Sequence, residues 1–427
     1  MTEFATGNQG GSNMGSFMSL TIPVHLPTLT TNNPTASALL PTPQLTIAPQ
    51  LSGWTDLAPE RQGVDFGQES FFKYINNDTD TATDCWLAVR LDGLVAGVGG
   101  TNPRYPDDVL AQAIERVTFV YGTDLQILDG DKLHYDLLMM DDEETQRREA
   151  HLRGYNLSLG ERITNATSPK WYWLRIPFWW TLRSQDAWHQ YALQRLTRIV
   201  FKFRGPQAIL QQEGANTRPT TMGGGNYIMD HFVRFRTTAL SEGVKQEFVR
   251  RLQANGTAGQ LYLFEDVQRL QQEIRPLQNR HVIQVNTFTK FAYNMRFVLR
   301  PLSALVPNYL DNDRFRLRKI DAARFDIGGR QFMPMTDHTW MTHGTDEALW
   351  KGNPERAIYN IPFSDFPNMV ASAVGGIDFS NASNPQLTLY TDSLGESHTL
   401  DIFLQCYNYI RVTMVGNNTG AEVIQAI

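Results

Sequence analysis

The stretch FAYNMRFVLR, residues 291–300, carries the clearest structural signal in the chain. Two sets of side chains alternate along it: Phe291, Tyr293, Met295, Phe297 and Leu299, and Ala292, Asn294, Arg296, Val298 and Arg300. Successive side chains of a β-strand point to opposite faces, so a period of two predicts a strand with one buried face. We expect the first set in a hydrophobic core and the arginines in water or at an interface.

The same alternation recurs through the rest of the body. Apolar residues alternate with basic ones at 198–204, and a last long strand places on one face Ile402, Leu404, Cys406, Ile410 and Val412. Phe325 and Ile327 lead into Gly328-Gly329, a two-residue hairpin turn that needs positive φ. The body is therefore predicted to be mainly β.

Helical patterns are local and lie in the second half. Ser241 is placed to cap a helix that ends at Gly256, with Val244, Phe248 and Leu252 on one face. A second helix is predicted over 261–277 from the spacing of its apolar residues, Phe264, Val267, Leu270 and Ile274, and from Pro276.

Length and composition indicate a chain of more than one domain. The 427 residues, 19% of them charged and 11% aromatic, can form two or three units. Residues 1–50 contain Glu3 as their only charged residue and predict an extended arm. The glycine- and proline-rich stretch 205–225 divides the remainder, which predicts a first unit at 51–218 and a second at 219–427. Each has the size of an eight-stranded antiparallel sandwich.

Charge and segment patterns disfavour several classes of protein. A net charge of −6 argues against direct sequence-specific nucleic-acid binding. Apolar runs such as 174–180 are too short to span a membrane, and residues 1–15 lack the features of a secretory signal, which favours a cytosolic chain. Cys85 and Cys406 are too few for a disulfide framework and are interpreted as buried thiols.

No pattern indicates catalysis, a metal or a cofactor. A polar group near the end of the second half matches no metal-ligand spacing and is interpreted as a loop: Asp337, His338, His343, Asp346 and Glu347. Adjacent acids at 141–144 favour a solvated helix start or loop over a catalytic pair, which would need two carboxylates across a cleft. No nucleophile motif is present. The sequence therefore predicts no catalytic, metal-binding or cofactor-binding residues.

Two further features leave alternatives open. The densest aromatic cluster suits a core, a subunit contact or the stacking platform of a lectin-like tandem sandwich: Trp171, Tyr172, Trp173, Phe178, Trp179 and Trp180. Candidate glycan attachment sites of the Asn-x-Ser/Thr type are Asn77, Asn156, Asn165, Asn255, Asn381 and Asn417. Without export they would not meet the secretory glycosylation machinery.

Several segments resemble the double jelly-roll major capsid proteins of large eukaryotic DNA viruses. The last quarter carries most of the likeness: AIYNIPF at 357–363, GGIDFSN at 375–381, NPQLTL at 384–389 and YNYIRV at 407–412. In that family a G-x-x-N-F-S-R-I-D-N-x-x-L segment precedes a strand that ends N-Y-N-x-L-R. Here Asp378 replaces the family's Asn and Asn381 its usual Arg, so the resemblance implies a divergent member.

Earlier segments agree with this resemblance. LRIPFWW at 174–180 is similar to the family's L-x-I-P-L-x-F-W segment, residues 198–204 resemble the end of its first jelly roll, and 118–133 looks like its I-G-G-x-x-I-D hairpin. The likeness covers most of 70–427. It implies an all-β fold of two tandem eight-stranded jelly-roll β-sandwiches with short helices in loops and an extended N-terminal arm.

The resemblance also implies a structural role in an icosahedral virion. It implies a homotrimer with a pseudo-hexameric outline that contacts neighbouring capsomers, minor capsid proteins and vertex proteins, with an inner lipid membrane in many relatives. Assembly in the cytoplasm of the host cell is expected.

Overall fold

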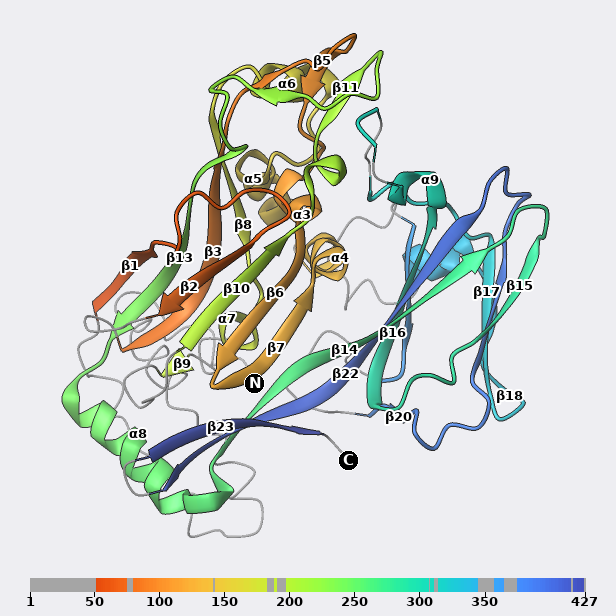
Figure 1. The fold of residues 1–427 in the computed structure, drawn as a ribbon. Coiled ribbons are helices and arrows are strands. Elements are labelled where there is room, and N and C mark those ends of the chain that lie inside the picture. The colour runs from red at the N-terminus through yellow and green to blue at the C-terminus, as the bar shows by residue number, and fades with distance from the viewer. Residues whose placement is uncertain are drawn as a thin grey trace, which may run out of the picture.

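A computed structural model describes residues 51–74, 80–140, 143–182, 188–189, 197–306, 308–310, 314–344, 357–364, 375–415 and 418–425. The predicted arm at 1–50 lies outside the described residues. The described part forms two β-sandwiches side by side, drawn mainly in orange to green and in green to blue (Figure 1).

The first sandwich, sandwich 1, consists of two facing antiparallel sheets. Sheet A has the order β1-β13-β3-β8, with the short β9 beside β3, and sheet B has the order β2-β10-β6-β7. The strands of sheet A are β1 Leu51–Leu57, β3 Thr81–Leu91, β8 Lys170–Arg175, β9 Trp188–His189 and β13 Ile228–Ala239. Those of sheet B are β2 Glu69–Tyr74, β6 Ile114–Tyr121, β7 Thr123–Asp129 and β10 Thr197–Phe203.

The second sandwich, sandwich 2, is built in the same way. Sheet C has the order β14-β22-β16-β19, with β20 beside β16 and β23 beside β22, and sheet D has the order β15-β21-β17-β18. Sheet C contains β14 Gln260–Ile274, β16 Phe291–Pro301, β19 Ile358–Pro362, β20 Ile377–Asp378, β22 His398–Val415 and β23 Asn418–Gln425. Sheet D contains β15 Arg280–Gln284, β17 Ala322–Ile327, β18 Arg330–Asp337 and β21 Gln386–Tyr390.

Both sandwiches share one strand order. When the eight main strands of each are counted along the chain, one sheet holds the first, eighth, third and sixth, and the other holds the second, seventh, fourth and fifth. Two sheets linked by such crossovers are the eight-stranded jelly roll. The predicted fold class, two tandem eight-stranded jelly rolls, is confirmed.

The strand pairing moves the boundary between the two units. Strand β13 begins after residue 218, yet it pairs with β1 and with β3 as the eighth strand of sandwich 1. The glycine-rich stretch around 205–225 is therefore the loop between the seventh and eighth strands. Sandwich 1 accordingly extends to Ala239, and β10 is its seventh strand, not its end.

The strand predicted over residues 291–300 is present as β16, with one irregularity. A β-bulge between Ala292 and Asn294 shifts its register against β22. Because an extra residue at a bulge reverses the alternation, Ala292 joins the core of sandwich 2 while Tyr293 packs against Tyr407 on the other face. Met295, Phe297 and Leu299 lie in the core as predicted.

The helix predicted over 261–277 is wrong, because these residues form strand β14. It pairs with β22 along its whole length, from Gln260 opposite Val412 to Ile274 opposite His398. Its apolar residues serve different surroundings: Phe264 enters the core of sandwich 1 and Ile274 that of sandwich 2. Val267, on the opposite face of the strand, packs against the cluster that contains Tyr135 and Phe403, and its place between Phe264 and Leu270 gives the apolar residues the spacing of a helix.

Other local predictions are confirmed. Helix α8, Glu242–Asn255, begins after Ser241, ends at Gly256 and buries Val244, Phe248 and Leu252. Ser241 occupies the N-cap position, but its side chain makes no capping hydrogen bond. Gly328 and Gly329 have φ of 59° and 75° and join β17 to β18. These signals lie within a few residues of the structure they specify, which is why sequence reveals them.

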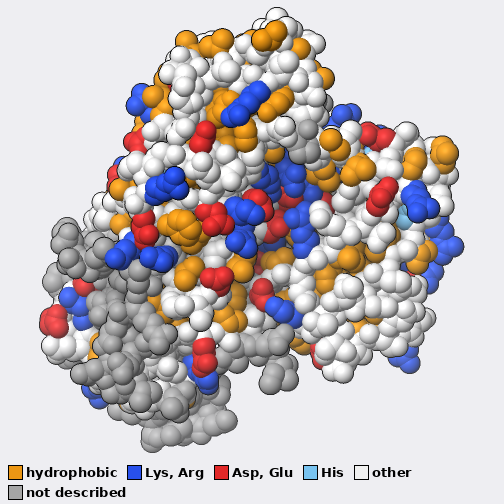
Figure 2. Space-filling view, viewed as in Figure 1, with side chains coloured by type: hydrophobic (Ala, Val, Ile, Leu, Met, Phe, Trp, Pro, Cys, Tyr) orange, Lys and Arg blue, Asp and Glu red, His pale blue; other side chains and the backbone are white. Residues whose placement is uncertain are grey.

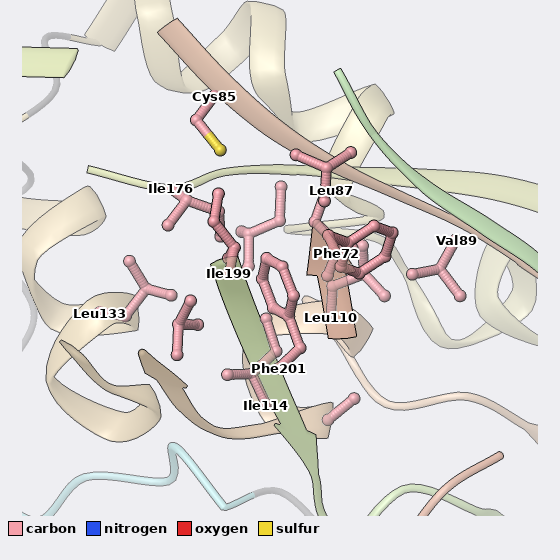
Figure 3. Packing of buried hydrophobic residues seen from close by; sticks show 14 of the residues in the cluster. Phe72, Cys85, Leu87, Val89, Leu110, Ile114, Leu133, Ile176, Ile199 and Phe201 are labelled. Carbon is pink, nitrogen blue, oxygen red and sulfur yellow. The ribbon is translucent and has the colours of Figure 1, made fainter. Parts of the chain in front are cut away.

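The cores lie between the paired sheets. In sandwich 1, Phe72, Leu87, Ile199 and Phe201 from both sheets meet Leu110 and Leu133 from helices (Figure 3). Leu110 lies on α3 Val109–Ala113 and Leu133 on α4 Gly130–Met140. The other helices near sandwich 1 are α5 Glu143–Arg153, α6 Leu159–Asn165 and α7 Trp179–Leu182, and α9 Leu302–Leu305 lies in sandwich 2. Short strands β4 Leu94–Val95, β5 Thr101–Arg104, β11 Gln211–Glu213 and β12 Thr220–Thr221 order the loops above sandwich 1.

Candidate functional site

The two sandwiches meet along a contact that we call the seam, in which α4 and the end of β7 face the outer side of sheet C. Figure 2 shows acidic and basic side chains gathered in the furrow between the two lobes. Arg296 and Arg300 of β16 are completely buried there. Their predicted place, towards water or an interface, is thus settled as an interface within the chain.

Asp131 of α4 is the centre of the seam and has no exposed surface. Its carboxylate accepts hydrogen bonds from Arg204 at 3.0 Å, Arg269 at 2.9 Å and Arg300 at 3.2 Å. A fourth guanidinium, that of Arg314, donates at 2.8 and 3.0 Å. Of these four, only Arg204 belongs to sandwich 1, so a single carboxylate holds three basic groups of sandwich 2.

Further carboxylates complete this network. Asp401 of β22 accepts hydrogen bonds from Arg269 at 2.6 Å and from Arg300 at 2.8 Å, and Asp129 accepts one from Arg269 at 2.7 Å. Four guanidinium groups thus surround three carboxylates, from Asp129, Asp131 and Asp401. Charges removed from water need such pairing, since an unpaired buried charge is strongly destabilising.

The pKa values of these groups reflect the pairing. Burial opposes ionisation of Asp131, but Arg300, Arg204 and Arg314 outweigh it and lower the pKa of Asp131 well below its usual range. Burial lowers the pKa of Arg204 to about 10, although Asp131 opposes the shift. Asp131 and Arg204 are therefore both charged near neutral pH.

A second group of charges extends the seam along α4. The Lys132 ammonium donates to Asp136 and to Glu265 of β14, and Arg296 donates to Asp136. Burial of Lys132 is outweighed by Asp136 and Glu265, so the pKa of Lys132 is raised. In this second group Lys132 and Arg296 donate to the carboxylates of Asp136 and Glu265. Charged groups that bind one another in this way suit a structural contact better than proton transfer.

Apolar contacts close both sides of the charged seam. Tyr135, Leu138 and Met139 of α4 pack with Val298 and Phe403 of sheet C. Further along, a ribbon made of β14 and β22 passes beneath sandwich 1 (Figure 1). The core of sandwich 1 takes up four side chains of this ribbon: Tyr262, Phe264, Ile410 and Val412. The two jelly rolls are thus joined through a shared core as well as through ion pairs.

Sequence reasoning did not identify Asp131, Arg269 or Asp401 as members of a site. No local pattern marks them, because their partners lie far away along the chain: Arg204 is 73 residues from Asp131, and the other ion pairs of the network join residues 101 to 183 apart. The arginines of β16 were the one signal of this site in the sequence, because the alternation places Arg296 and Arg300 on the face opposite to the apolar core residues.

Of the polar group considered as metal ligands, the structure describes the side chains of Asp337 and His338. Asp337 accepts a hydrogen bond from the Trp340 amide at 2.7 Å, and the His338 ring contacts the Tyr359 hydroxyl at 2.9 Å. Nothing is described for the side chain of His343, and Asp346 and Glu347 lie outside the described residues. Within the described ranges, no group of three or more metal-ligating side chains occurs.

The acidic run at 141–144 is described only in part. Asp141 and Asp142 lie outside the described residues, and Glu143 begins α5. Glu144 is exposed and pairs with Arg148 one turn later, as the predicted solvated helix start requires. In the part of the chain that the structure describes, no helix is long and apolar enough to cross a bilayer.

The aromatic cluster divides between two environments. Tyr172, Phe178, Trp179 and Trp180 are buried in sandwich 1, where Trp179 also meets Phe264 with ring centres 6.3 Å apart. Trp171 and Trp173 lie on the outer face of sheet A and are half-buried. The core interpretation is confirmed for the four buried residues.

The remaining candidate residues are placed as follows. Cys85 and Cys406 are buried free thiols, as predicted, and burial raises the pKa of both. Asn156 and Asn381 are exposed, Asn165 and Asn255 are half-buried, and Asn77 and Asn417 lie outside the described residues. Their use for glycan attachment stays a prediction.

Comparisons with known proteins agree with the double jelly roll. Neither a protein-family model nor a curated protein sequence matches the chain. The fold is similar to that of PBCV-1 VP54, fitted into a reconstruction of the virophage Sputnik, with TM-score 0.65, 15% identity, and 88% of this chain and 97% of that one covered. The Faustovirus major capsid protein gives TM-score 0.65 at 10% identity, with 93% of this chain and 98% of that one covered. The mavirus major capsid protein gives TM-score 0.51 at 8% identity over 87% and 90%.

Proposed function

We propose that the chain is a major capsid protein, the structural subunit of an icosahedral DNA virus. The observation that carries this proposal is the repetition of one jelly-roll strand order in two sandwiches that a buried seam joins rigidly. Similar structures include the Faustovirus major capsid protein at TM-score 0.65 and a model of the PBCV-1 virus capsid at TM-score 0.66, of which 98% and 97% are covered.

The proposed subunit acts as a homotrimer. Three copies with two similar sandwiches each present six similar units, so the trimer has a pseudo-hexameric outline that can tile a shell. Its partners are neighbouring capsomers, minor capsid proteins and vertex proteins, with a lipid membrane beneath the shell. The protein would reside in the virion after assembly in the host-cell cytoplasm, and it needs no catalytic residue for this role.

The seam has a mechanical purpose in this proposal. A shell subunit must hold its two sandwiches at a fixed angle, because small rotations would accumulate across a lattice. Buried ion pairs are directional, because the planar guanidinium group donates its hydrogen bonds to a carboxylate along fixed directions. The seam would therefore set the angle between the sandwiches while the shared core supplies the hydrophobic contact.

Light scattering of the purified protein, followed by negative-stain imaging, tests the proposal. A particle of about three times 48.5 kDa with a hexagonal outline is expected. A monomer across the concentrations that the sample tolerates would contradict it. A monomer retained on a glycan column would instead favour the lectin-like alternative.

A further inference from the structure

The outer faces of sheets A and C, which are equivalent sheets of the two sandwiches, differ in how much of them is covered. In sandwich 2, the outer face of sheet C is covered by α4 and β7 of sandwich 1, and Arg296, Val298 and Arg300 of its third strand are buried. Sheet A is the equivalent sheet of sandwich 1, since both hold the first, eighth, third and sixth strands. Its outer face carries side chains that remain partly open to solvent.

The open face of sheet A has the composition of a protein interface. The Trp171 and Trp173 rings both pack against the Phe232 ring, with centres 5.2 and 5.4 Å apart. The Arg234 guanidinium lies over Trp173 at 4.9 Å and pairs with Asp56 of β1. Trp54 on the edge strand is 56% exposed. Aromatic side chains next to arginine are typical of the residues that carry most of the energy of a protein contact.

The opposite flank of the molecule presents a second open surface. In the seam, sandwich 1 contributes its fifth strand, β7, and the helix that follows. The equivalent part of sandwich 2 is β18 with the short π-helix η7, Trp340–Gly344, and β18 lies at the end of the molecule away from sandwich 1 (Figure 1). Phe332, Met335 and Trp340 are 46%, 46% and 61% exposed there.

We propose that the outer face of sheet A binds the β18 flank of a second copy of this chain. This contact between two chains would have the same arrangement as the seam within one chain. The fifth strand of sandwich 2 in one copy, with the segment after it, would cover the outer face of sheet A in the other copy. Such a contact uses two different surfaces of each copy, and it forms a closed ring where the rotation that relates neighbouring copies closes. The inference deepens the proposed function, on which it rests, by naming the surfaces that join the trimer.

The test uses charge placed on each surface separately. Phe232→Asp changes the face of sheet A, Met335→Asp changes the β18 flank, and Val98→Asp is the matched control on a side chain that is 89% exposed elsewhere. A carboxylate in a closed apolar contact should raise the dissociation constant of the trimer by roughly 30-fold or more. We expect both variants to dissociate at concentrations at which Val98→Asp and the wild-type chain remain trimers.

Cross-linking tests the pairing of the two surfaces. Chains carrying Trp173→Cys and chains carrying Met335→Cys would be assembled together and treated with a short thiol cross-linker, while Cys85 and Cys406 stay buried. Cross-links between the two kinds of chain, and none within samples of either kind alone, are expected. If Phe232→Asp fails to fold, slow oxidation of Trp173 and Trp340 in the wild-type trimer relative to the subunit after dissociation supports the same contact.

The outcomes separate this inference from the proposed function. A wild-type trimer that survives both aspartate variants, or that cross-links through other surfaces, overturns the inference and leaves the capsid role intact. A wild-type chain that is monomeric overturns both. A trimer that withstands Phe232→Asp but loses glycan binding would assign the aromatic face to a sugar.

Discussion

Replacement of the buried Asp131 by Asn should destabilise the protein more than removal of one charge from an ion pair on the surface. Asp131 has no exposed surface, and four guanidinium groups donate to it. Asn is nearly the same size but is neutral, and its amide group would face donors. The variant leaves four guanidinium groups against the carboxylates of Asp129 and Asp401. Loss of one partner from a buried ion pair costs about 3 to 5 kcal/mol.

Urea unfolding monitored by tryptophan fluorescence measures this loss. The matched control is Glu115→Gln, which removes the pair with Lys202 at 2.6 Å, where the side chains are 45% and 38% exposed. That change should cost at most about 1 kcal/mol, because water screens exposed pairs. A loss for Asp131→Asn that is within about 1 kcal/mol of the control would refute the view that Asp131 holds the seam.

A double-mutant cycle and acid titration sharpen the result. Asp131→Asn combined with Arg300→Met should cost about 2 kcal/mol less than the sum of the single changes, since each removes the partner of the other. The pKa of Asp131 is lowered in the folded state, so its contribution is complete above the unfolded value near 4 and is lost as pH falls below it. The wild-type chain should therefore lose stability below about pH 4 more steeply than Asp131→Asn.

Three further predictions concern other parts of the fold. Burial lowers the pKa of His231 to about 4, so stability should fall by about 3 kcal/mol as pH decreases from about 6.5 to 4, and His231→Gln should flatten this slope in urea titrations at several pH values. Gly130→Ala should cost about 3 kcal/mol, because its Cβ would lie 2.0 Å from the Ile114 carbonyl oxygen, whereas Gly160→Ala, with open space around it, should not destabilise; thermal melts compare the two. Cys85 and Cys406 should react with Ellman's reagent only in denaturant, and rapid labelling of the native protein would contradict their burial.

The sequence by itself determined the local elements and the class of fold. Alternation identified β10, β16 and β22, glycines identified the turn between β17 and β18, and capping and spacing identified α8. These features depend on contacts within a few residues, or on whether the two faces of a strand meet different surroundings, as the core and the charged seam do on β16. The family resemblance added the double jelly roll, which the strand order confirms.

The tertiary structure alone decided how distant segments meet. Nothing near β13 shows that it is the eighth strand of sandwich 1, because its partners β1 and β3 lie over 130 residues earlier. β14 resembles a helix in sequence since two different cores cover it, and the bulge in β16 turns Tyr293 away from the core. The same holds for the charged seam, because Asp131 is buried among arginines only when distant segments of the chain pack together.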